Sequence, residues 1–428
     1  MTQPRNPRQV PPQFWSILAA ALLLPLPAAT AGAEDRMDEL IQRLERQEQE
    51  LQALRGEVRE LREHGARPDP EHPEWRREDG EDTLTEYRNP AVRLDISGQV
   101  NQAFNLAADG RQTKGYFVDN DASLSRIRFA GVGTFDGGPD VGSTLEVSFS
   151  PNNSFDVSQD NEVAGSFIQV RRAEIFAMDE RFGRVMLGQG SAAADNTAEY
   201  DLSLVGSPIM LSGISFFAGG LQFTDEYGLT GVTLDDAFFN FDGNRETRFR
   251  YDTPMWGPLQ VSVSAGADQR YDAAITLGGD FDHWTGVELG GLTVLGALSI
   301  HDPNRDDTDF RVAGSGSLLH NASGVSLTVS GGFAEGTEGT PYNTYAKLGW
   351  DTSLLRFGPT GFGVDYTWTE DVSADGDQGQ SVGLAAVQVF QDYGIEFYSQ
   401  FRWFTLDRAE SPSFDDMYIG TAGARIRF

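Results

Sequence analysis

The chain has 428 residues, with 33 Lys and Arg against 64 Asp and Glu, and a formal net charge of -31 at pH 7. This acidic balance argues against a nucleic-acid partner, because phosphates need a basic surface. Cysteine is absent, which excludes disulfides, thiolate catalysis and cysteine-ligated metal sites. The histidines are scattered without metal-ligand spacing, so we expect no metal and no cofactor. After residue 33 no apolar run reaches the ~18 residues of a membrane-spanning helix.

Residues 1–33 have the organisation of an export signal. Two arginines precede an apolar run over residues 14–26, and residues 31–33 (AGA) form a small-residue cleavage site. An N-terminal membrane anchor is the alternative. The apolar run is short for that role and contains two prolines. We therefore predict that the chain is exported.

Residues 34–65 are predicted to form a parallel coiled coil. Apolar side chains recur at the a and d positions of successive heptads, and the flanking pairs are opposite in charge, namely Arg43–Glu48, Glu50–Arg55 and Glu57–Arg62. We expect this segment to associate copies of the chain, although these residues do not fix their number. A single helix packed on its own protein would need a wider apolar stripe. Residues 66–91 combine prolines with many charges, which predicts an extended, poorly ordered linker.

From Val92 to Phe428 the pattern changes to period two, which is typical of strands. Clear examples lie at 144–149, 325–330 and 362–369, where apolar or aromatic residues alternate with polar or charged ones. Such strands can form a soluble sandwich with a dry core. They can also form a membrane barrel that is apolar outside and wet inside. We favour the barrel because the polar faces carry charges in mid-strand, aromatic residues crowd the strand ends, and short connections alternate with long ones.

The connections predict the number of strands. The short ones, expected to be periplasmic turns, lie at 136–140, 179–183, 254–258, 283–286, 321–324, 353–360 and 391–394. The long ones lie at 107–119, 151–165, 191–243, 268–271, 301–308, 335–341, 370–379 and 407–415. They separate sixteen strands, an even number that leaves both barrel ends in the periplasm. Further strands within 191–243 would give eighteen. The predicted fold class is thus all-β transmembrane: an antiparallel up-and-down β-barrel behind an α-helical coiled coil.

Several segments resemble the outer-membrane porins of Gram-negative bacteria. Residues 126–131 (RIRFAG) resemble a porin R-x-x-F-x-G strand, 171–190 resemble the strand–turn–strand before the porin constriction loop, and 248–257 (RFRYDTPMWG) resemble the strand after it. A coiled coil before the barrel is similar to the DcaP-like trimeric porins. The resemblance implies a homotrimer of sixteen-stranded barrels, each with its third extracellular loop folded into the lumen. The terminal aromatic Phe428 resembles the insertion signal that the barrel-assembly machinery recognises in such proteins.

Alternation predicts which side chains enter the lumen. The inward basic residues are Arg126, Arg128, Arg248 and Arg250, together with Arg172, whose parity relative to Arg171 is ambiguous. Arg126 also matches a wall arginine of the porin pattern. Porins of this family oppose a basic wall with an acidic third loop, and the candidate loop acids are Asp195, Glu199 and Asp201. The alternative is that the arginines are structural and pair with carboxylates across the barrel interior.

Together these features predict a porin of the bacterial outer membrane, with its coiled coil in the periplasm. We expect passive diffusion of small hydrophilic solutes, weak preference for small anions such as carboxylates, and contact with outer-membrane lipid and lipopolysaccharide. The alternative is an envelope-tethering or adhesion protein that is anchored by its barrel and acts through its coiled coil. We find no catalytic constellation and expect no enzyme activity. Asp371, Asp375 and Asp377 either bind a divalent ion or form a solvated acidic loop.

Overall fold

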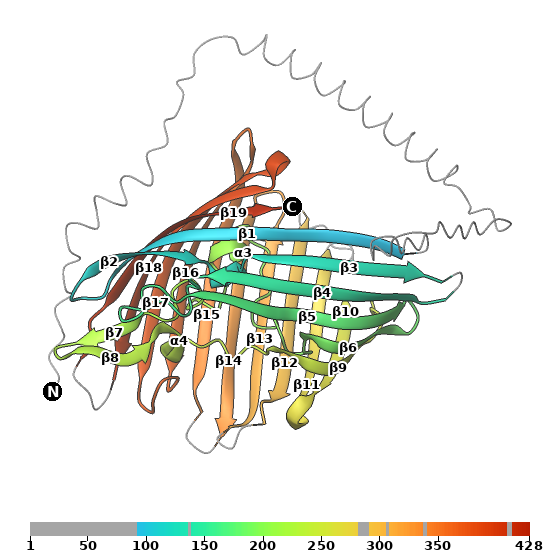
Figure 1. Ribbon diagram of the computed structural model, residues 1–428, viewed down its shortest axis with the longest axis horizontal. Helices are drawn as coiled ribbons and strands as arrows, with labels where there is room; N and C mark the ends of the chain where they lie inside the picture. Colours follow the sequence, from blue (N-terminus) through green and yellow to red (C-terminus); the bar gives the residue numbers. More distant parts are fainter. Residues whose placement is uncertain (1–91, 136–137, 281–290, 305–307, 337–339, 409–412) are drawn as a thin grey trace, which may run out of the picture. The chain divides into compact units, whose positions relative to one another are not determined.

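A computed structural model describes residues 92–428 of the chain, apart from 136–137, 281–290, 305–307, 337–339 and 409–412 (Figure 1). The predicted export signal (1–33), coiled coil (34–65) and linker (66–91) lie outside the described residues. Within the described ranges, no helix has the length and hydropathy needed to cross a membrane.

Strands make up most of the described chain. They are β1 (Val92–Ala108), β2 (Thr113–Asp119), β3 (Arg126–Thr134), β4 (Asp140–Pro151), β5 (Ser166–Asp179), β6 (Gly183–Ser191), β7 (Gln222–Asp225), β8 (Gly228–Thr233), β9 (Arg245–Asp252), β10 (Leu259–Gly266), β11 (Tyr271–Asp280), β12 (Leu292–Asp302), β13 (Thr308–His320), β14 (Val325–Gly336), β15 (Tyr342–Leu355), β16 (Gly358–Glu370), β17 (Gln378–Phe390), β18 (Ile395–Asp407) and β19 (Met417–Arg427). The short helices are α3 (Gly206–Ile209) and α4 (Leu234–Ala237), with 3-10 turns η1 (Asp121–Ser123), η2 (Ala267–Gln269) and η3 (Gln391–Tyr393).

The large sheet is a closed antiparallel barrel. β1 pairs with the last strand, β19, on one edge and with β2 and β3 on the other. β2 and β3 lie against successive halves of β1, with η1 between them, so the 17 strands of the sheet occupy sixteen positions. The predicted strand number and fold class of the barrel are confirmed. β7 and β8 form a separate 2-stranded sheet, so the strands within 191–243 do not enlarge the barrel.

The barrel wall is apolar outside and polar inside, as the alternation predicted. On β14, Leu327 is 42% exposed whereas its neighbour Thr328 is 3% exposed. On β16, Val364 is likewise exposed and Asp365 is buried. A soluble sandwich would bury the apolar set instead. The outward apolar surface therefore fits a wall that faces lipid.

The predicted long connection at 107–119 is wrong. β1 ends at Ala108 and β2 begins at Thr113, so a tight turn joins them. The Asp109 carboxylate accepts hydrogen bonds from the backbone N–H groups of Arg111 (3.0 Å) and Gln112 (2.8 Å). Gly110 takes a positive φ of 90°, which glycine adopts without steric cost. Asp-Gly is a strong turn signal that the prediction overlooked.

Candidate functional site

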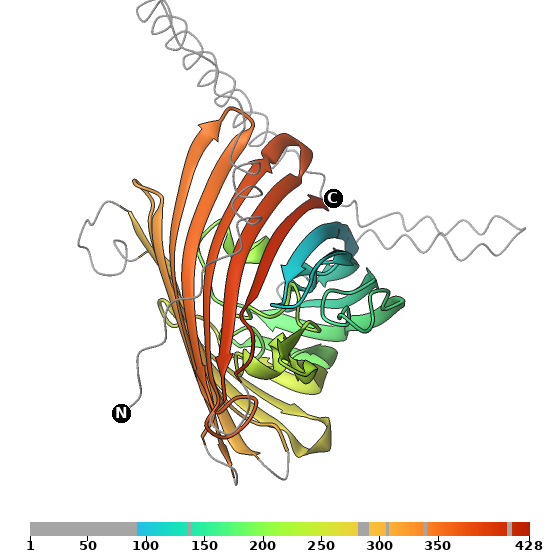
Figure 2. The ribbon, with the colours of Figure 1, turned by 90° about the vertical axis from the view of Figure 1, so that its left-hand side faces the viewer.

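Residues 192–244, called the inner segment here, link β6 to β9 and run inside the barrel, except for the β7–β8 hairpin, which lies at its rim (Figures 1 and 2). Inward side chains from strands around the wall bind its backbone: Asn105 of β1 donates to Phe217 O (2.7 Å), Ser330 of β14 to Ala198 O (2.7 Å), Thr369 of β16 to Ala237 O (2.9 Å) and Arg425 of β19 to Ser207 O (2.7 Å). The inner segment covers nearly the same residues as the predicted pore loop at 191–243, and the role of this loop in the pore stays a prediction.

Inward serines hold the first part of the inner segment. The hydroxyl of Ser264 on β10 accepts from Ala193 N–H (2.8 Å). The hydroxyl of Ser315 on β13 accepts from Tyr200 N–H (2.9 Å) and lies 2.6 Å from Thr197 O. Because this stretch contains little regular secondary structure, its backbone needs partners from the wall. The strands supply those partners with small polar side chains.

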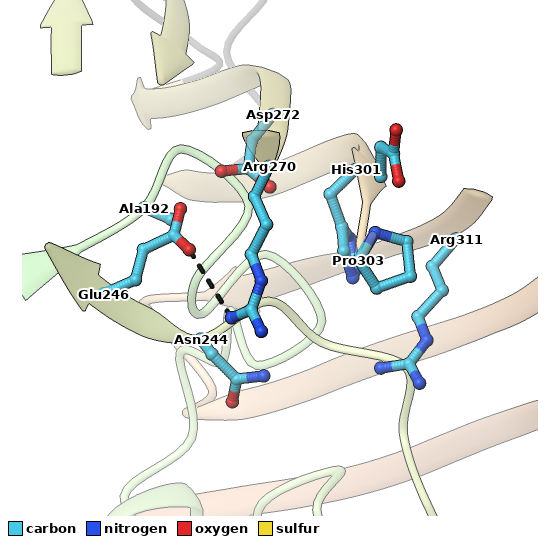
Figure 3. Close-up of a pocket in the computed structure, with 9 residues that line it drawn as sticks. Ala192, Asn244, Glu246, Arg270, Asp272, His301, Pro303 and Arg311 are labelled. Atoms are coloured by element: carbon cyan, nitrogen blue, oxygen red, sulfur yellow. Dashed lines mark ion pairs between the residues drawn. The ribbon is translucent and has the colours of Figure 1, made fainter. Parts of the chain in front are cut away.

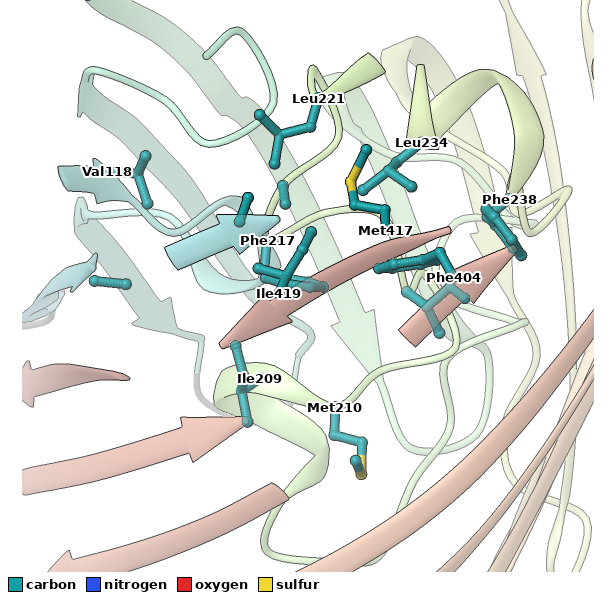
Figure 4. Close-up of a cluster of buried hydrophobic side chains, with 14 of the residues drawn as sticks. Val118, Ile209, Met210, Phe217, Leu221, Leu234, Phe238, Phe404, Met417 and Ile419 are labelled. Atoms are coloured by element: carbon teal, nitrogen blue, oxygen red, sulfur yellow. The ribbon is translucent and has the colours of Figure 1, made fainter. Parts of the chain in front are cut away.

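The second part of the inner segment packs into an apolar cluster (Figure 4). Its Phe217, Leu221, Leu234 and Phe238 meet inward residues of β18 and β19, namely Phe404, Leu406, Met417 and Ile419. The expectation that inward faces are polar is wrong along this part of the wall. Inward apolar residues are tolerated there because the inner segment covers them and excludes water. Both faces of β18 are consequently apolar near Phe404, which weakens the period-two signal.

Lys347 on β15 pins two points of the inner segment. Its ammonium is ion-paired with Asp201 and donates to Met210 O (2.8 Å). Lys347 is 1% exposed, so the pair is shielded from water. Directly across the register, Asp365 is paired with the buried Arg402 (2.5 Å). Sequence analysis missed Lys347; its position on the polar face of a strand was the one available signal.

Arginines form a row across β3, β5 and β9. Cross-strand pairing places Arg128 opposite Glu146, and Glu146 opposite Arg172. One step further, Glu174 lies opposite Gly188, which lies opposite Arg248. The predicted basic residues of these strands are therefore brought together on one part of the wall.

A β-bulge settles the ambiguous parity at Arg171 and Arg172. Pairing shifts at this point, since Glu146 pairs with Arg172 while Val147 pairs with Val170. A bulge places two residues against one. Both guanidinium groups therefore reach carboxylates, Arg171 to Glu146 (2.8 Å) and Arg172 to Glu174 (3.4 Å). Arg171 is an addition to the predicted set.

The row is only partly neutralised by acids. Arg248 is buried against Glu174 (2.6 Å), and Arg250 pairs with Asp252 (2.7 Å) while donating to Ala192 O (2.7 Å). Arg248 therefore stabilises the barrel wall, and Arg250 also attaches the start of the inner segment to it. The side chains of Arg126 and Arg172 keep 29% and 26% exposure, so they remain accessible to solutes.

The predicted loop acids have separate partners. Asp201 pairs with Lys347, and Asp195 lies 3.6 Å from Arg245. Glu199 accepts from the amide of Asn240 (3.3 Å). Burial, and then the charge of Asp195, raises the pKa of Glu199 to about 7. Burial, and then the charge of Glu199, raises the pKa of Asp242 well above its ordinary value.

Two other predicted features are placed as follows. Asp377 is paired with Arg408 of the connection that follows β18 (2.6 Å), and Asp371 accepts from Gly376 N–H within its own loop (2.7 Å), so both carboxylates have partners in the protein. Phe428 follows β19 at the barrel seam. Its backbone exchanges two hydrogen bonds with Gly98 of β1 (2.8 and 3.0 Å), and its ring is 65% exposed.

Comparison with known proteins identifies the family. Residues 89–408 match the family model of the Gram-negative porins. The chain therefore belongs to the Gram-negative porin family, and its place is the bacterial outer membrane. Among curated proteins, none has a sequence significantly similar to that of this chain.

Solved porin structures share the fold. The anion-selective porin from Comamonas acidovorans superposes with a TM-score of 0.51 at 14% identity, covering 79% of this chain and 100% of that one. OmpT of Vibrio cholerae gives 0.51 at 12% identity, over 80% of this chain and 99% of that one. The outer-membrane channel DcaP of Acinetobacter baumannii gives 0.50 at 11% identity, over 80% and 99%. At these identities the likeness concerns the fold.

Proposed function

We propose that this porin allows passive diffusion of small hydrophilic solutes, with a weak preference for small anions such as carboxylates. The observation that carries the preference is the arginine row on β3, β5 and β9, in which Arg126 and Arg172 stay accessible. Guanidinium groups bind carboxylates in a bidentate geometry. The anion-selective porin from Comamonas acidovorans, which has the same fold, is consistent with this proposal.

The acidic residues of the inner segment oppose this preference weakly. Asp201 and Asp195 each lie beside a cation. Burial and the charge of Asp195 raise the pKa of Glu199, which lowers its tendency to carry negative charge. The remaining negative charge of the chain acts at longer range, where a Debye length of ~8 Å at physiological salt screens it. Arginines at a narrow passage act on a partly dehydrated solute and are screened less.

Reversal potentials in a KCl gradient across planar bilayers test the preference. The native protein should favour chloride at high salt, and Arg126→Ala/Arg128→Ala should shift the reversal potential towards cations. Arg181→Ala is the matched control, because Arg181 lies on an exposed turn and should leave selectivity unchanged. A cation-selective native channel, or an unchanged double variant, would contradict the proposal.

We also propose a homotrimer that the coiled coil at 34–65 helps to assemble. The opposite charges at 43–62 support association between parallel helices, and OmpT of Vibrio cholerae, with the same fold, is known in a trimer form. Deleting residues 37–63 should slow or weaken trimer formation, measured by native electrophoresis, while single-channel conductance stays similar. A halved conductance in intact trimers would indicate that the segment lines or obstructs the pore.

The tethering alternative has less support, because a barrel that serves only as an anchor needs no infolded segment.

A further inference from the structure

A small polar pocket lies where the inner segment enters and leaves the wall (Figure 3). Ala192 and Asn244, the two ends of the inner segment, border it. The charged lining comes from the adjacent ends of β9, β11, β12 and β13, with Arg270 directly before β11, at the side of the long connections. The position is separate from the arginine row on β3 and β5.

The pocket carries charges of both signs. Arg270 and Arg311 supply guanidinium groups, whereas Glu246 and Asp272, together with the exposed Asp302 at the rim, supply carboxylates. Figure 3 shows Arg270 reaching between Glu246 and Asn244, with Asp272 close to the base of its side chain. Arg311 lies with its guanidinium 5.0 Å from the ring centre of Phe239, which fixes its orientation. A solute here meets cations and anions within one small volume.

Arg270 and Glu246 satisfy one another poorly. The only ion pair between pocket residues that the structure records in the described part of the chain joins Arg270 Nη1 and Glu246 Oε2 at 3.6 Å. Elsewhere the same two residue types pair closely, as Arg248 and Glu174 do at 2.6 Å. Arg270 Nε and Glu246 Oε1 have no hydrogen-bond partner, and the same is true of Nδ1 of the buried His301. Hydrogen-bonding capacity is thus left over for a ligand.

We propose that this pocket binds a small zwitterion of the free α-amino acid class; the proposal rests on the porin function above. The carboxylate of the ligand would lie against the guanidinium group of Arg270, where charge-assisted hydrogen bonds are strong, and the nearby Arg311 would add positive charge. Its ammonium group would lie against Glu246 and Asp272. A simple anion would meet those two carboxylates, and a simple cation would meet the two arginines. A ligand with both charges is favoured because it alone complements both sets.

Single-channel recording with matched solutes tests the site. L-serine carries no net charge, so a fall in KCl current on its addition reports occupancy and not added conduction. Glycerol, also a three-carbon polar solute, controls for viscosity, and propionate and propylammonium supply one charge each. We expect L-serine to lower the current saturably and glycerol to have only its viscosity effect.

Two single variants test the basic and the acidic side of the pocket separately. Arg270→Gln and Glu246→Gln should each raise the half-saturating L-serine concentration about tenfold, the change expected when one charge-assisted hydrogen bond is lost. Arg181→Gln is the control, because Arg181 lies on the exposed turn between β5 and β6, away from the pocket. This variant should leave the half-saturating L-serine concentration unchanged. Saturation-transfer NMR with L-serine and the full-length protein in detergent measures binding without requiring conduction.

The outcomes distinguish this proposal from the porin function. Conducting channels on which L-serine acts no differently from glycerol would overturn the site and leave the porin function intact. Propionate block that Arg270→Gln removes and Glu246→Gln does not would make the pocket an anion site and overturn the zwitterion assignment. If no conductance is seen, the porin function fails. The site is then tested by NMR alone: an L-serine signal that Arg270→Gln and Glu246→Gln weaken supports it, and the absence of that signal overturns it.

Discussion

Channels carrying Lys347→Met should pass a larger and noisier current than native channels. The variant keeps the length of the side chain but leaves Asp201 as an unpaired carboxylate in a shielded position. Removing one partner of a buried ion pair costs ~3–5 kcal/mol. Because Lys347 also holds Met210 O, the inner segment loses two attachment points at once. Planar-bilayer recording measures the consequence directly.

A thiol reporter follows the inner segment itself. The chain has no cysteine, so Ser203→Cys introduces one reactive thiol at a buried site whose hydroxyl has no hydrogen-bond partner. Maleimide labelling should accelerate roughly a hundredfold in Lys347→Met, as expected for an opening made ~3 kcal/mol easier. Lys114→Met is the control, because Lys114 makes a more exposed pair with Glu162. Equal labelling in the two lysine variants would mean that the segment is held without this pair. Adding Asp201→Asn to Lys347→Met should restore part of the slow labelling.

Cells producing Phe428→Ala should contain several-fold less folded protein in the outer membrane. Phe428 ends the closing strand with its ring exposed on the outer face, which is where a C-terminal insertion signal would be read. The ring also covers Gly98, where a Cβ atom would lie 2.6 Å from the Phe428 ring. Heat-modified mobility in electrophoresis of outer-membrane fractions measures the folded share, and the fraction that folds should conduct normally.

Two comparisons separate a recognition role from simple packing at the seam. Phe397→Ala removes another outward phenylalanine, 51% exposed on β18, and should have a small effect. Refolding of Phe428→Ala from urea into detergent should reach near-native yield if the ring is read by the assembly machinery. A matching loss in detergent would show that the ring acts through its contact with Gly98.

Period-two alternation was sufficient to predict the barrel wall. Exposed Leu327 beside buried Thr328 is the general case, and counting turns gave sixteen positions. The pattern fails where a local feature overrides it. The Asp109-Gly110 turn was hidden in a stretch interpreted as a long connection, and the bulge at Arg171 changes inward parity within one residue.

Contacts of the inner segment were beyond sequence reasoning for a physical reason. Lys347 and Asp201 are 146 residues apart. The alternation of residues around either position indicates which side chains point inward, but it does not indicate which distant residue they contact. Alternation within each strand predicts only that the arginines point inward, and their role in the pore stays a prediction. The inward apolar residues Phe404 and Ile419 are explained only by the segment that covers them, and alternation assigned that face to polar residues.

The contacts of the inner segment with both sides of the seam constrain the order of assembly. Asn105 of β1 binds Phe217 O, and Arg425 of β19 binds Ser207 O, yet these are the first and last strands to be made. A ring closed around an empty interior would wet the apolar side chains of β18 and β19. Closure of the ring and docking of the segment therefore stabilise each other, because the segment contacts both terminal strands. Pairings so distant in sequence are slow to form, so the last stage of folding should be the slowest.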